Sequence, residues 1–253
     1  MSFQVPGDSY DRFMGRWSVE LAPVFADYGR VEAGQQVLDV GCGSGVLTAE
    51  LARRVGEENV AGVDPSPLLE ACRDRVPGAD LRQGAAEDLP WADDSFDAAL
   101  AQLVVHFMAD PVAGVAEMAR VTRPGGAVAA CTWDFADGME MLRIYWESAR
   151  AVDPDAPSEE RLFGRPEELL ELWRATGLED AQVEPLEATR SYEDFHELWN
   201  TFLLGAGPSG QFLIAQEHET QEAIRREYFG RLGEPRGRFE LRARAWAARG
   251  RVT

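Results

Sequence analysis

The stretch Val37–Gly45, with the sequence VLDVGCGSG, joins a short apolar run to three alternating glycines. The apolar run predicts a buried strand, and the glycines predict a loop with backbone conformations closed to other residues. Because glycine has no Cβ, the main chain of such a loop can approach a ligand closely. A helix is predicted from about Val46, and its free N–H groups and positive dipole end would face a bound anion. The stretch therefore predicts a site for a nucleotide cofactor.

The spacing of the glycines distinguishes between candidate cofactors. A dinucleotide-binding loop has its third glycine five residues after the first, where this chain has Val46. A phosphate-binding P-loop needs a lysine, and the chain has none because all 25 of its basic residues are arginine. The remaining pattern, Asp39 two residues before GxGxG, suits a nucleoside whose tail is an amino acid, since loop N–H groups would face a carboxylate. That ligand is S-adenosylmethionine, and S-adenosylhomocysteine would be its product.

The composition of the 253 residues limits the partners. A formal net charge of −19 disfavours nucleic acid and anionic membrane, because phosphate binding depends on clustered basic side chains. A small neutral or cationic substrate fits better, and a homodimer is compatible with the sequence. The N-terminus lacks the basic and apolar regions of a signal peptide, and no run of 18 apolar residues exists, so we expect a cytoplasmic protein. The three cysteines form no CxxC pair, and no metal site is indicated.

From residue 36 to about 133, apolar segments alternate with helical patterns. This alternation predicts a parallel sheet with helices on both faces. The predicted strands are Gln36–Val40, Asn59–Asp64, Asp80–Gln83, Phe96–Gln102 and Gly126–Thr132. The predicted helices are Val46–Arg54, Pro67–Arg75 and Pro111–Thr122.

Beyond Trp133 the pattern changes to amphipathic helices and longer loops, interrupted by two late strands. The last strand is predicted from apolar residues that alternate with arginine and glutamate, which would give it one polar face. We therefore expect one domain of residues 1–253. Its parts are an N-terminal cap 1–35, a cofactor-binding core 36–134, a helical lid 135–180 and 190–235, and late strands 181–189 and 238–249.

Four motifs in this order resemble the class I S-adenosylmethionine-dependent methyltransferases, especially their broad group that acts on small molecules. They are the glycine loop, Val60–Ser66 (VAGVDPS), Gly84–Trp91 (GAAEDLPW) followed by Asp94–Asp97 (DSFD), and Arg120–Gly126 (RVTRPGG). The resemblance covers residues 37–134. It implies a Rossmann-like α/β fold with a seven-stranded, mostly parallel sheet flanked by helices, an antiparallel last strand and a helical lid inserted before it. It also implies in-line methyl transfer to a small-molecule acceptor.

The resemblance assigns roles to the first two motifs. Asp64 and the neighbouring Pro65 would lie at the ribose, where the carboxylate can accept from both hydroxyls. The alternative role of Asp64 is that of an N-cap for the following helix. Asp39 would orient the loop through hydrogen bonds to its N–H groups, or meet the methionine ammonium through water. Gly41 and Gly43 would let the methionyl part lie against the main chain.

The adenine loop departs from the family pattern. The family usually has Asp or Asn where this chain has Ala85, and alanine cannot accept a hydrogen bond from the adenine amino group. We expect the backbone of Ala85 and Ala86 to pair with the ring edge, with Glu87 or Asp88 supplying the acceptor.

Two further segments are predicted near the methionine end of the cofactor. Gln102 and Leu103 follow the fourth strand, where the crevice of a doubly wound sheet opens. Tyr10 and Arg16 lie in an N-terminal segment that resembles the family's variable cap. They could close on the methionine carboxylate, Arg16 by a charge-assisted bond. The alternative for this segment is an amphipathic helix that packs on the sheet.

A general base is optional, because methyl transfer from a sulfonium depends mainly on alignment and exclusion of water. His106 follows the fourth strand and could remove a proton from the acceptor; the alternative is that it packs at a helix start. His196 and His218 are weaker candidates. Aromatic side chains in the helical region suit an aromatic or lipophilic acceptor, although most would be core. They are Trp133, Phe135, Tyr145, Trp146, Trp199, Phe202 and Phe212.

Two other functions stay open. A protein that binds the cofactor without transferring methyl, as a regulator or partner subunit, is favoured by the departure at Ala85. A nucleotide-dependent oxidoreductase is opposed by the missing third glycine.

Overall fold

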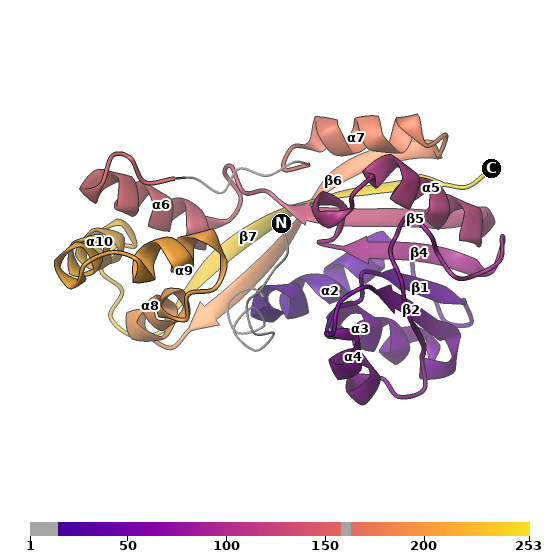
Figure 1. Cartoon of the computed structure of the whole chain (residues 1–253), viewed down its shortest axis with the longest axis horizontal. Coiled ribbons are helices and arrows are strands. Elements are labelled where there is room, and N and C mark those ends of the chain that lie inside the picture. Colours follow the sequence, from indigo (N-terminus) through magenta and orange to yellow (C-terminus); the bar gives the residue numbers. More distant parts are fainter. Residues whose placement is uncertain (1–14, 158–162) are drawn as a thin grey trace. The chain divides into compact units, whose positions relative to one another are not determined.

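The computed structural model describes residues 15–157 and 163–253, and they separate into two compact units. The sheet unit comprises residues 18–133, 163–186 and 245–253, and the helical unit comprises residues 15–17, 134–157 and 187–244. The strands are β1 (Val37–Val40), β2 (Val60–Asp64), β3 (Asp80–Gln83), β4 (Phe96–Gln102), β5 (Thr122–Trp133), β6 (Glu179–Tyr192) and β7 (Phe239–Arg251). The helices are α2 (Arg16–Tyr28), α3 (Val46–Val55), η2 (Glu57–Asn59), α4 (Leu69–Arg75), η3 (Val105–Phe107), α5 (Pro111–Val121), α6 (Glu140–Val152), α7 (Pro166–Ala175), α8 (Phe195–Leu203), α9 (Gly207–Ile214) and α10 (His218–Arg231) (Figure 1).

The seven strands form one sheet in the order β3-β2-β1-β4-β5-β7-β6. The pairs β2–β3, β1–β2, β1–β4 and β4–β5 are parallel, whereas β7 is antiparallel to β5. Strands β1 and β2 are buried along their whole length, which explains their continuous apolar runs. The predicted fold class is confirmed, including the antiparallel last strand.

One face of the sheet packs against α5 and α7. Leu38 and Val40 of β1 belong to the same buried cluster as Met118 of α5 and Trp173 of α7. The indole Nε1 of Trp173 donates to the Val128 carbonyl of β5 at 3.2 Å. The sequence analysis assigns residues 135–180 as a whole to the lid, but α7 groups with the sheet. An amphipathic pattern shows which face of a helix is apolar and leaves open which element covers that face.

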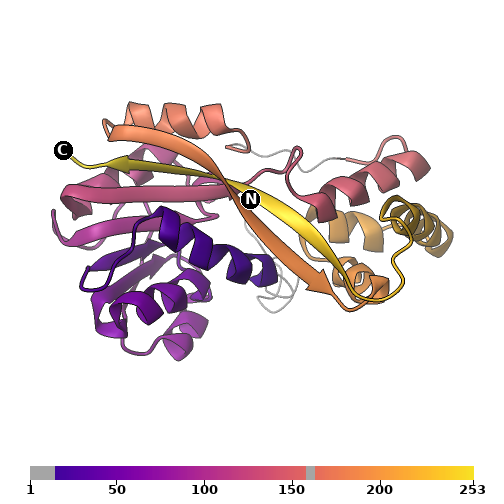
Figure 2. The same cartoon turned by 180° about the vertical axis from the view of Figure 1, so that it is seen from behind.

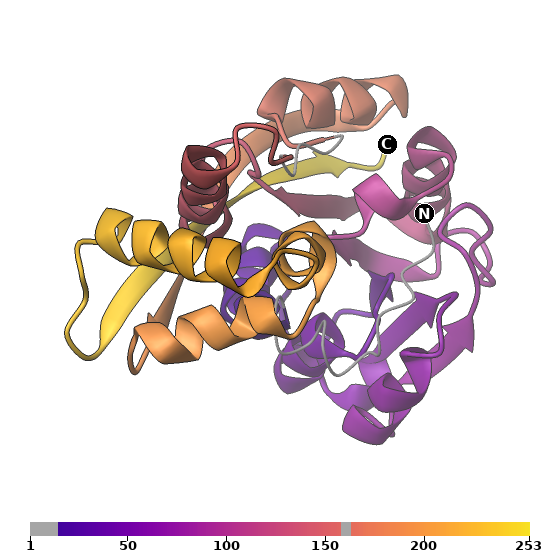
Figure 3. The same ribbon diagram turned by 60° about the vertical axis from the view of Figure 1, so that its left-hand side comes forward.

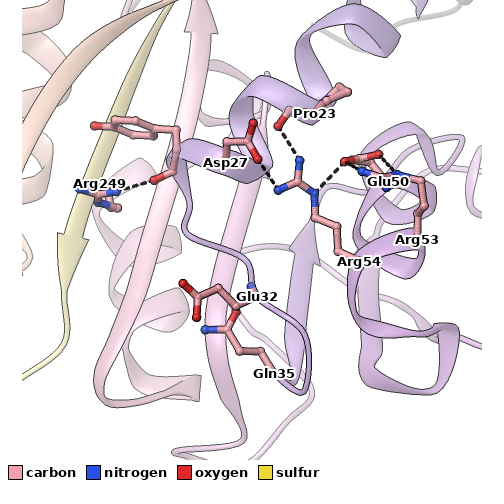
Figure 4. A network of polar contacts seen from close by, with 9 residues as sticks. Pro23, Asp27, Glu32, Gln35, Glu50, Arg53, Arg54 and Arg249 are labelled. Carbon is pink, nitrogen blue, oxygen red and sulfur yellow. Dashed lines mark hydrogen bonds and ion pairs between the residues drawn. The ribbon is translucent and has the colours of Figure 1, made fainter.

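The opposite face carries α2 and α3 (Figure 2). Arg54 of α3 joins the two helices through two hydrogen bonds and makes a third within α3 (Figure 4). Its guanidinium donates to the Asp27 carboxylate at 2.6 Å, the Pro23 carbonyl at 2.8 Å and the Glu50 carboxylate at 2.7 Å. The Pro23 carbonyl and Asp27 belong to α2, so one side chain fixes the register between the helices. Trp17 and Leu21 of α2 are fully buried, as expected for the amphipathic helix that the sequence analysis gives as the alternative.

Strand β5 begins four residues before the predicted start. It pairs with β4 already at Thr122, and the register shifts between Phe96 and Ala98. The turn residues Gly125 and Gly126 exchange backbone hydrogen bonds with Val252, at 2.8 and 3.0 Å. The Pro-Gly-Gly sequence at residues 124–126, which is typical of a turn, thus lies at an irregularity inside the strand.

The helical unit contains α6, α8, α9 and α10 (Figure 3). Aromatic side chains of α6, α8 and α10 contact one another. The rings of Tyr145 and Phe202 stack with their centroids 4.4 Å apart, and both contact Tyr228. The Tyr145 hydroxyl donates to the Ser209 carbonyl at 3.0 Å, and the Tyr228 hydroxyl donates to the Met141 carbonyl at 3.1 Å. Tyr145 and Phe202, two of the seven aromatic candidates for the acceptor pocket, are thus fully buried in this unit. None of the helices among the described residues combines the length and apolarity needed to cross a membrane.

Candidate functional site

The carboxyl ends of the parallel strands β2, β1, β4 and β5 meet at one edge of the sheet, where doubly wound folds bind ligands. The glycine loop leaves β1 at this edge. Gly41, Gly43 and Gly45 all have positive φ, at 72°, 52° and 84°. A Cβ on Gly41 would lie 2.5 Å from Val104, and one on Gly45 would lie 2.7 Å from the Cys72 sulfur. A Cβ on Gly43 would meet nothing within 4 Å, so the loop has an open side at this glycine.

Asp64, at the end of β2, binds the glycine loop directly. Its Oδ2 accepts from the Gly43 N–H at 2.8 Å, and its Oδ1 accepts from the Ser66 N–H at 2.8 Å and the Ser66 hydroxyl at 2.5 Å. The neighbouring Pro65 presents its carbonyl to Gln83 at 3.3 Å. Helix α4 begins only at Leu69, so Asp64 is not its N-cap. The carboxylate instead joins two strand ends. Its Oδ1 already accepts two hydrogen bonds and its Oδ2 accepts one, so one lone pair of Oδ2 remains.

Asp39 faces α3 from the middle of β1. Its Oδ2 accepts from the Thr48 hydroxyl at 2.7 Å, and its side chain is buried. This contact ties β1 to the first turns of α3. Burial raises the pKa of Asp39 to about 8, with Cys72 and Asp64 adding to the effect and the Thr48 hydrogen bond opposing it. A buried carboxyl with few charged partners holds its proton more tightly.

The adenine-loop candidates lie on different sides of their segment. Ala85 is exposed, whereas Ala86 belongs to the buried cluster under α5. Glu87 accepts through Oε1 from the N–H groups of Ala109 and Asp110, at 2.7 and 3.1 Å. This carboxylate therefore ties the loop to the segment that precedes α5, a contact that sequence spacing does not reveal.

The end of β4 carries two unusual features. Leu103 has a positive φ of 63°, and its N–H donates to the Cys131 carbonyl at 2.9 Å. Non-glycine residues in this conformation are strained and concentrate at functional sites. Gln102 donates through Nε2 to the Ser18 carbonyl at 3.1 Å. Its Oε1 is buried, and no described residue donates to it.

His106 lies in the short helix η3 directly after this turn. Its Nδ1 is 3.4 Å from the hydroxyl oxygen of Thr132, which is fully buried on β5. The imidazole also contacts the ring of Phe107, with centroids 4.1 Å apart. The histidine is therefore held at the strand edge from two sides. His196 and His218 lie in α8 and α10 of the helical unit.

Of the two N-terminal candidates, the structure describes only Arg16. Tyr10 lies outside the described residues. Arg16 is half exposed and pairs with Glu197 at 2.9 Å, and Arg190 reaches the same carboxylate oxygen at 3.5 Å. In the structure the guanidinium thus has a carboxylate partner within the helical unit.

Two pairs of side chains beneath the glycine loop were missed by the sequence analysis. One is Thr48 with Asp39, and the other is Cys42 with Cys72, which lie in one buried cluster. Both depend on how α3 and α4 pack on the strands. The only signal in the sequence was the placement of a small polar or thiol residue on the inner face of each helix.

Comparisons with known proteins agree with this arrangement. Residues 38–130 match the family described as methyltransferase domain. A demethylmenaquinone methyltransferase of Mycobacterium sp. (strain KMS) is 40% identical over 134 residues, which cover 49% of this chain and 56% of the relative. A chloroplastic 2-methyl-6-phytyl-1,4-hydroquinone methyltransferase of Oryza sativa subsp. japonica is 32% identical over 153 residues, which cover 59% of this chain and 43% of the relative. The chain spans about half the length of the curated relatives it matches.

A solved structure supports the fold over nearly the whole chain. An S-adenosylmethionine-dependent methyltransferase from Aquifex aeolicus superposes with a TM-score of 0.57 at 13% identity, covering 99% of this chain and 100% of the other. At this identity the likeness concerns the fold alone. Residues 38–130 are therefore a methyltransferase domain, and the sheet unit that contains them has the fold of the class I S-adenosylmethionine-dependent methyltransferases.

Proposed function

We propose that this chain transfers a methyl group from S-adenosylmethionine to a small-molecule acceptor. The observation that carries the proposal is the junction between Gly43 and Asp64. There a loop open on one side is fixed by the carboxylate that ends the neighbouring strand. The family match of residues 38–130 supports the choice of cofactor. When bound, S-adenosylmethionine would supply a methyl group on a positively charged sulfur. The acceptor would bond to the methyl carbon in line with the bond to sulfur, and the sulfur would leave.

The residues at the strand edge fit such a cofactor. The remaining lone pair of the Asp64 Oδ2 can accept from a ribose hydroxyl while the existing hydrogen bonds of the carboxylate hold the loop. The buried Oε1 of Gln102 needs a donor, and the ammonium of an amino-acid tail is one. The open side of Gly43 lets the main chain approach the ligand. Exposed Ala85 offers only its backbone to the adenine edge, while Glu87 is already engaged by two backbone N–H groups.

We assign His106 as the group that takes the acceptor's proton. The Thr132 hydroxyl can either accept from Nδ1–H or donate to Nδ1, and the first arrangement leaves Nε2 as the proton acceptor. Thr132 is then a positioning residue. Thr132→Val should shift the pH dependence of kcat, whereas Thr132→Ser should restore it. An unchanged pH profile in Thr132→Val and His106→Gln would exclude a base at this position.

The acceptor is proposed to be aromatic or lipophilic, as a quinol is. The names of two relatives, a demethylmenaquinone and a phytyl-hydroquinone methyltransferase, support this class. The net charge of −19 argues against nucleic acid as the acceptor.

The test is a screen of quinols, phenols, amines and carbon acids with methyl-labelled S-adenosylmethionine, preceded by calorimetry with S-adenosylhomocysteine and NADH. We expect S-adenosylhomocysteine to bind, NADH not to bind, and label to appear in at least one acceptor. Binding of NADH alone would contradict the proposal. Binding of S-adenosylhomocysteine with no transfer to any acceptor class would favour a cofactor-binding protein without methyl transfer.

A further inference from the structure

Two cysteines lie in contact beneath the glycine loop, and the proposed methyl transfer uses neither. Cys42 stands in the loop between Gly41 and Gly43, and Cys72 stands on α4. With Leu69 they form a small buried cluster of their own. The remaining cysteine, Cys131, is buried on β5 outside this cluster. Two thiols in contact satisfy the first requirement for a disulfide.

We infer that Cys42 and Cys72 form a reversible disulfide that switches off cofactor binding. The step is a two-electron oxidation, with a peroxide as the oxidant. One thiolate attacks the peroxide and becomes a sulfenic acid, and the second thiol displaces water from that sulfur. In sum, two thiols and one hydrogen peroxide give one disulfide and two waters, and a small thiol reductant reverses the change.

The surroundings of the two thiols shift their pKa values in opposite directions, which indicates which of them reacts with the oxidant. The neighbouring Cys42 thiol lowers the pKa of Cys72, and burial opposes that shift. The neighbouring Cys72 thiol and burial raise the pKa of Cys42. Because the thiolate is the reactive form, Cys72 is the thiol that meets the oxidant and Cys42 is the one that closes the disulfide.

The loop has no room to absorb the new bond. The Cys72 sulfur already lies 2.7 Å from the place where a Cβ on Gly45 would be, and the Cys42 sulfur lies 3.2 Å from the same place on Gly62. Drawing the sulfurs to bonding distance must therefore move the loop backbone. That backbone carries the Gly43 N–H bonded to Asp64, so the shift disturbs the junction on which cofactor binding is proposed to depend.

Access to the pair is controlled by the loop. Cys72 is fully buried and Cys42 is 6% exposed, so an oxidant reaches them when the loop opens locally. A ligand bound on the loop would hinder this opening. S-adenosylhomocysteine should therefore slow the oxidation.

The experiment treats the full chain with hydrogen peroxide and maps its thiols by alkylation and mass spectrometry. We expect a loss of two hydrogen atoms in mass, a peptide linking Cys42 to Cys72, and an alkylatable Cys131. Affinity for S-adenosylhomocysteine should fall by about tenfold or more on oxidation and return with dithiothreitol. In Cys72→Ser the ratio of oxidised to reduced affinity should be close to one, and Cys131→Ser should behave as wild type.

The outcomes separate this inference from the proposed function. The disulfide is measured by mass whether or not the chain binds the cofactor. Three free thiols after treatment, or a link that involves Cys131, would overturn the inference. A Cys42–Cys72 disulfide with unchanged affinity would overturn the switch. A protein that binds no S-adenosylhomocysteine even when reduced would contradict the proposed function instead.

Discussion

The strand-edge loops of the sheet unit and the aromatic core of the helical unit are held together by different means. In the loops, single backbone contacts decide residue identity, as in the contact of Gly41 with Val104 and the hydrogen bond from Gly43 to Asp64. In the helical unit, rings such as Tyr145, Phe202 and Phe229 fill a shared volume. Contacts of the first kind tolerate few substitutions, whereas a packed volume accepts others of similar size. A binding function is therefore expected to reside in the loops and acceptor choice in the more variable unit.

The largest effect on stability should come from the helical unit. Phe202→Ala removes a fully buried ring that stacks on Tyr145, and should lower the free energy of unfolding by about 3–5 kcal/mol. Leu203→Ala, the exposed neighbour on α8, is the matched control, and should change stability by about 0.5 kcal/mol or less. Chemical denaturation measures both. If Phe202→Ala also abolished S-adenosylhomocysteine binding in folded protein, the division of labour between the units would be wrong.

The glycine loop offers a matched pair of substitutions. Gly41→Ala forces a Cβ against Val104 at positive φ, and should cost about 2–4 kcal/mol of stability. Gly43→Ala meets no protein atom, so it should cost only the backbone term of about 1–2 kcal/mol. For ligand affinity we expect the opposite order. Relative to its loss of stability, Gly43→Ala should weaken ligand binding more than Gly41→Ala does. Denaturation and calorimetry on both variants test this, and equal stabilities would contradict the packing argument.

Asp39 should make the stability of the sheet unit depend on pH. Its folded pKa of about 8 lies above its unfolded value, so between pH 4 and 8 the folded state binds the extra proton. Stability contributed by this group is full at low pH and falls as pH rises through that window, by at most about 1.4 kcal/mol per pH unit. Asp39→Asn keeps the acceptor for Thr48 and should flatten the profile between pH 6 and 8. Parallel profiles for the two proteins would show that Asp39 is ionised in the fold.

Asp64 should govern affinity more than stability. Asp64→Ala removes both the support of Gly43 and the proposed ribose acceptor, and should weaken S-adenosylhomocysteine binding by about 1–3 kcal/mol. Ser66→Ala removes one contact to Oδ1 of the same carboxylate and leaves the free lone pair of Oδ2 in place, so it should weaken binding less. Calorimetry at matched pH gives both values. Unchanged affinity in Asp64→Ala would rule out the ribose role.

The smallest effect is expected at Arg16. Its ion pair with Glu197 is solvent-exposed, so Arg16→Gln should change stability by about 0.2–1 kcal/mol. A larger loss of S-adenosylhomocysteine affinity than of stability would show that the guanidinium leaves Glu197 for the ligand. Glu197→Gln is the control, because it frees the arginine and should then raise affinity.

The features of the sheet unit that depend on local residue patterns could be predicted from the sequence. Strands β1 and β2 were found because complete burial makes them continuously apolar, and Asp64 was found because a strand end positions its side chain. The start of β5 was missed because the turn residues at Gly125 lie within the strand. Strands and turns can be predicted from the sequence because each depends on a few neighbouring residues.

Contacts between helices and strands that are far apart in the chain could not be predicted from the sequence. The bond from Thr48 to Asp39 spans a helix and a strand, and Glu197 lies 181 residues from Arg16. The placement of α7 with the sheet depends on Trp173, whose apolar neighbours the amphipathic pattern does not name. In each case the sequence supplies a suitable side chain and the tertiary packing supplies its partner.

The close approach of Gly41 and Val104 limits how segments of this protein can be exchanged with those of homologues. Val104 belongs to the turn that holds Leu103 and precedes His106, whereas Gly41 belongs to the proposed cofactor loop. A graft of residues 103–107 from a relative with a larger side chain at 104 would push on the loop after β1. These two segments, 60 residues apart, can therefore be exchanged between homologues only as a matched set. Libraries that vary one should vary the other with it.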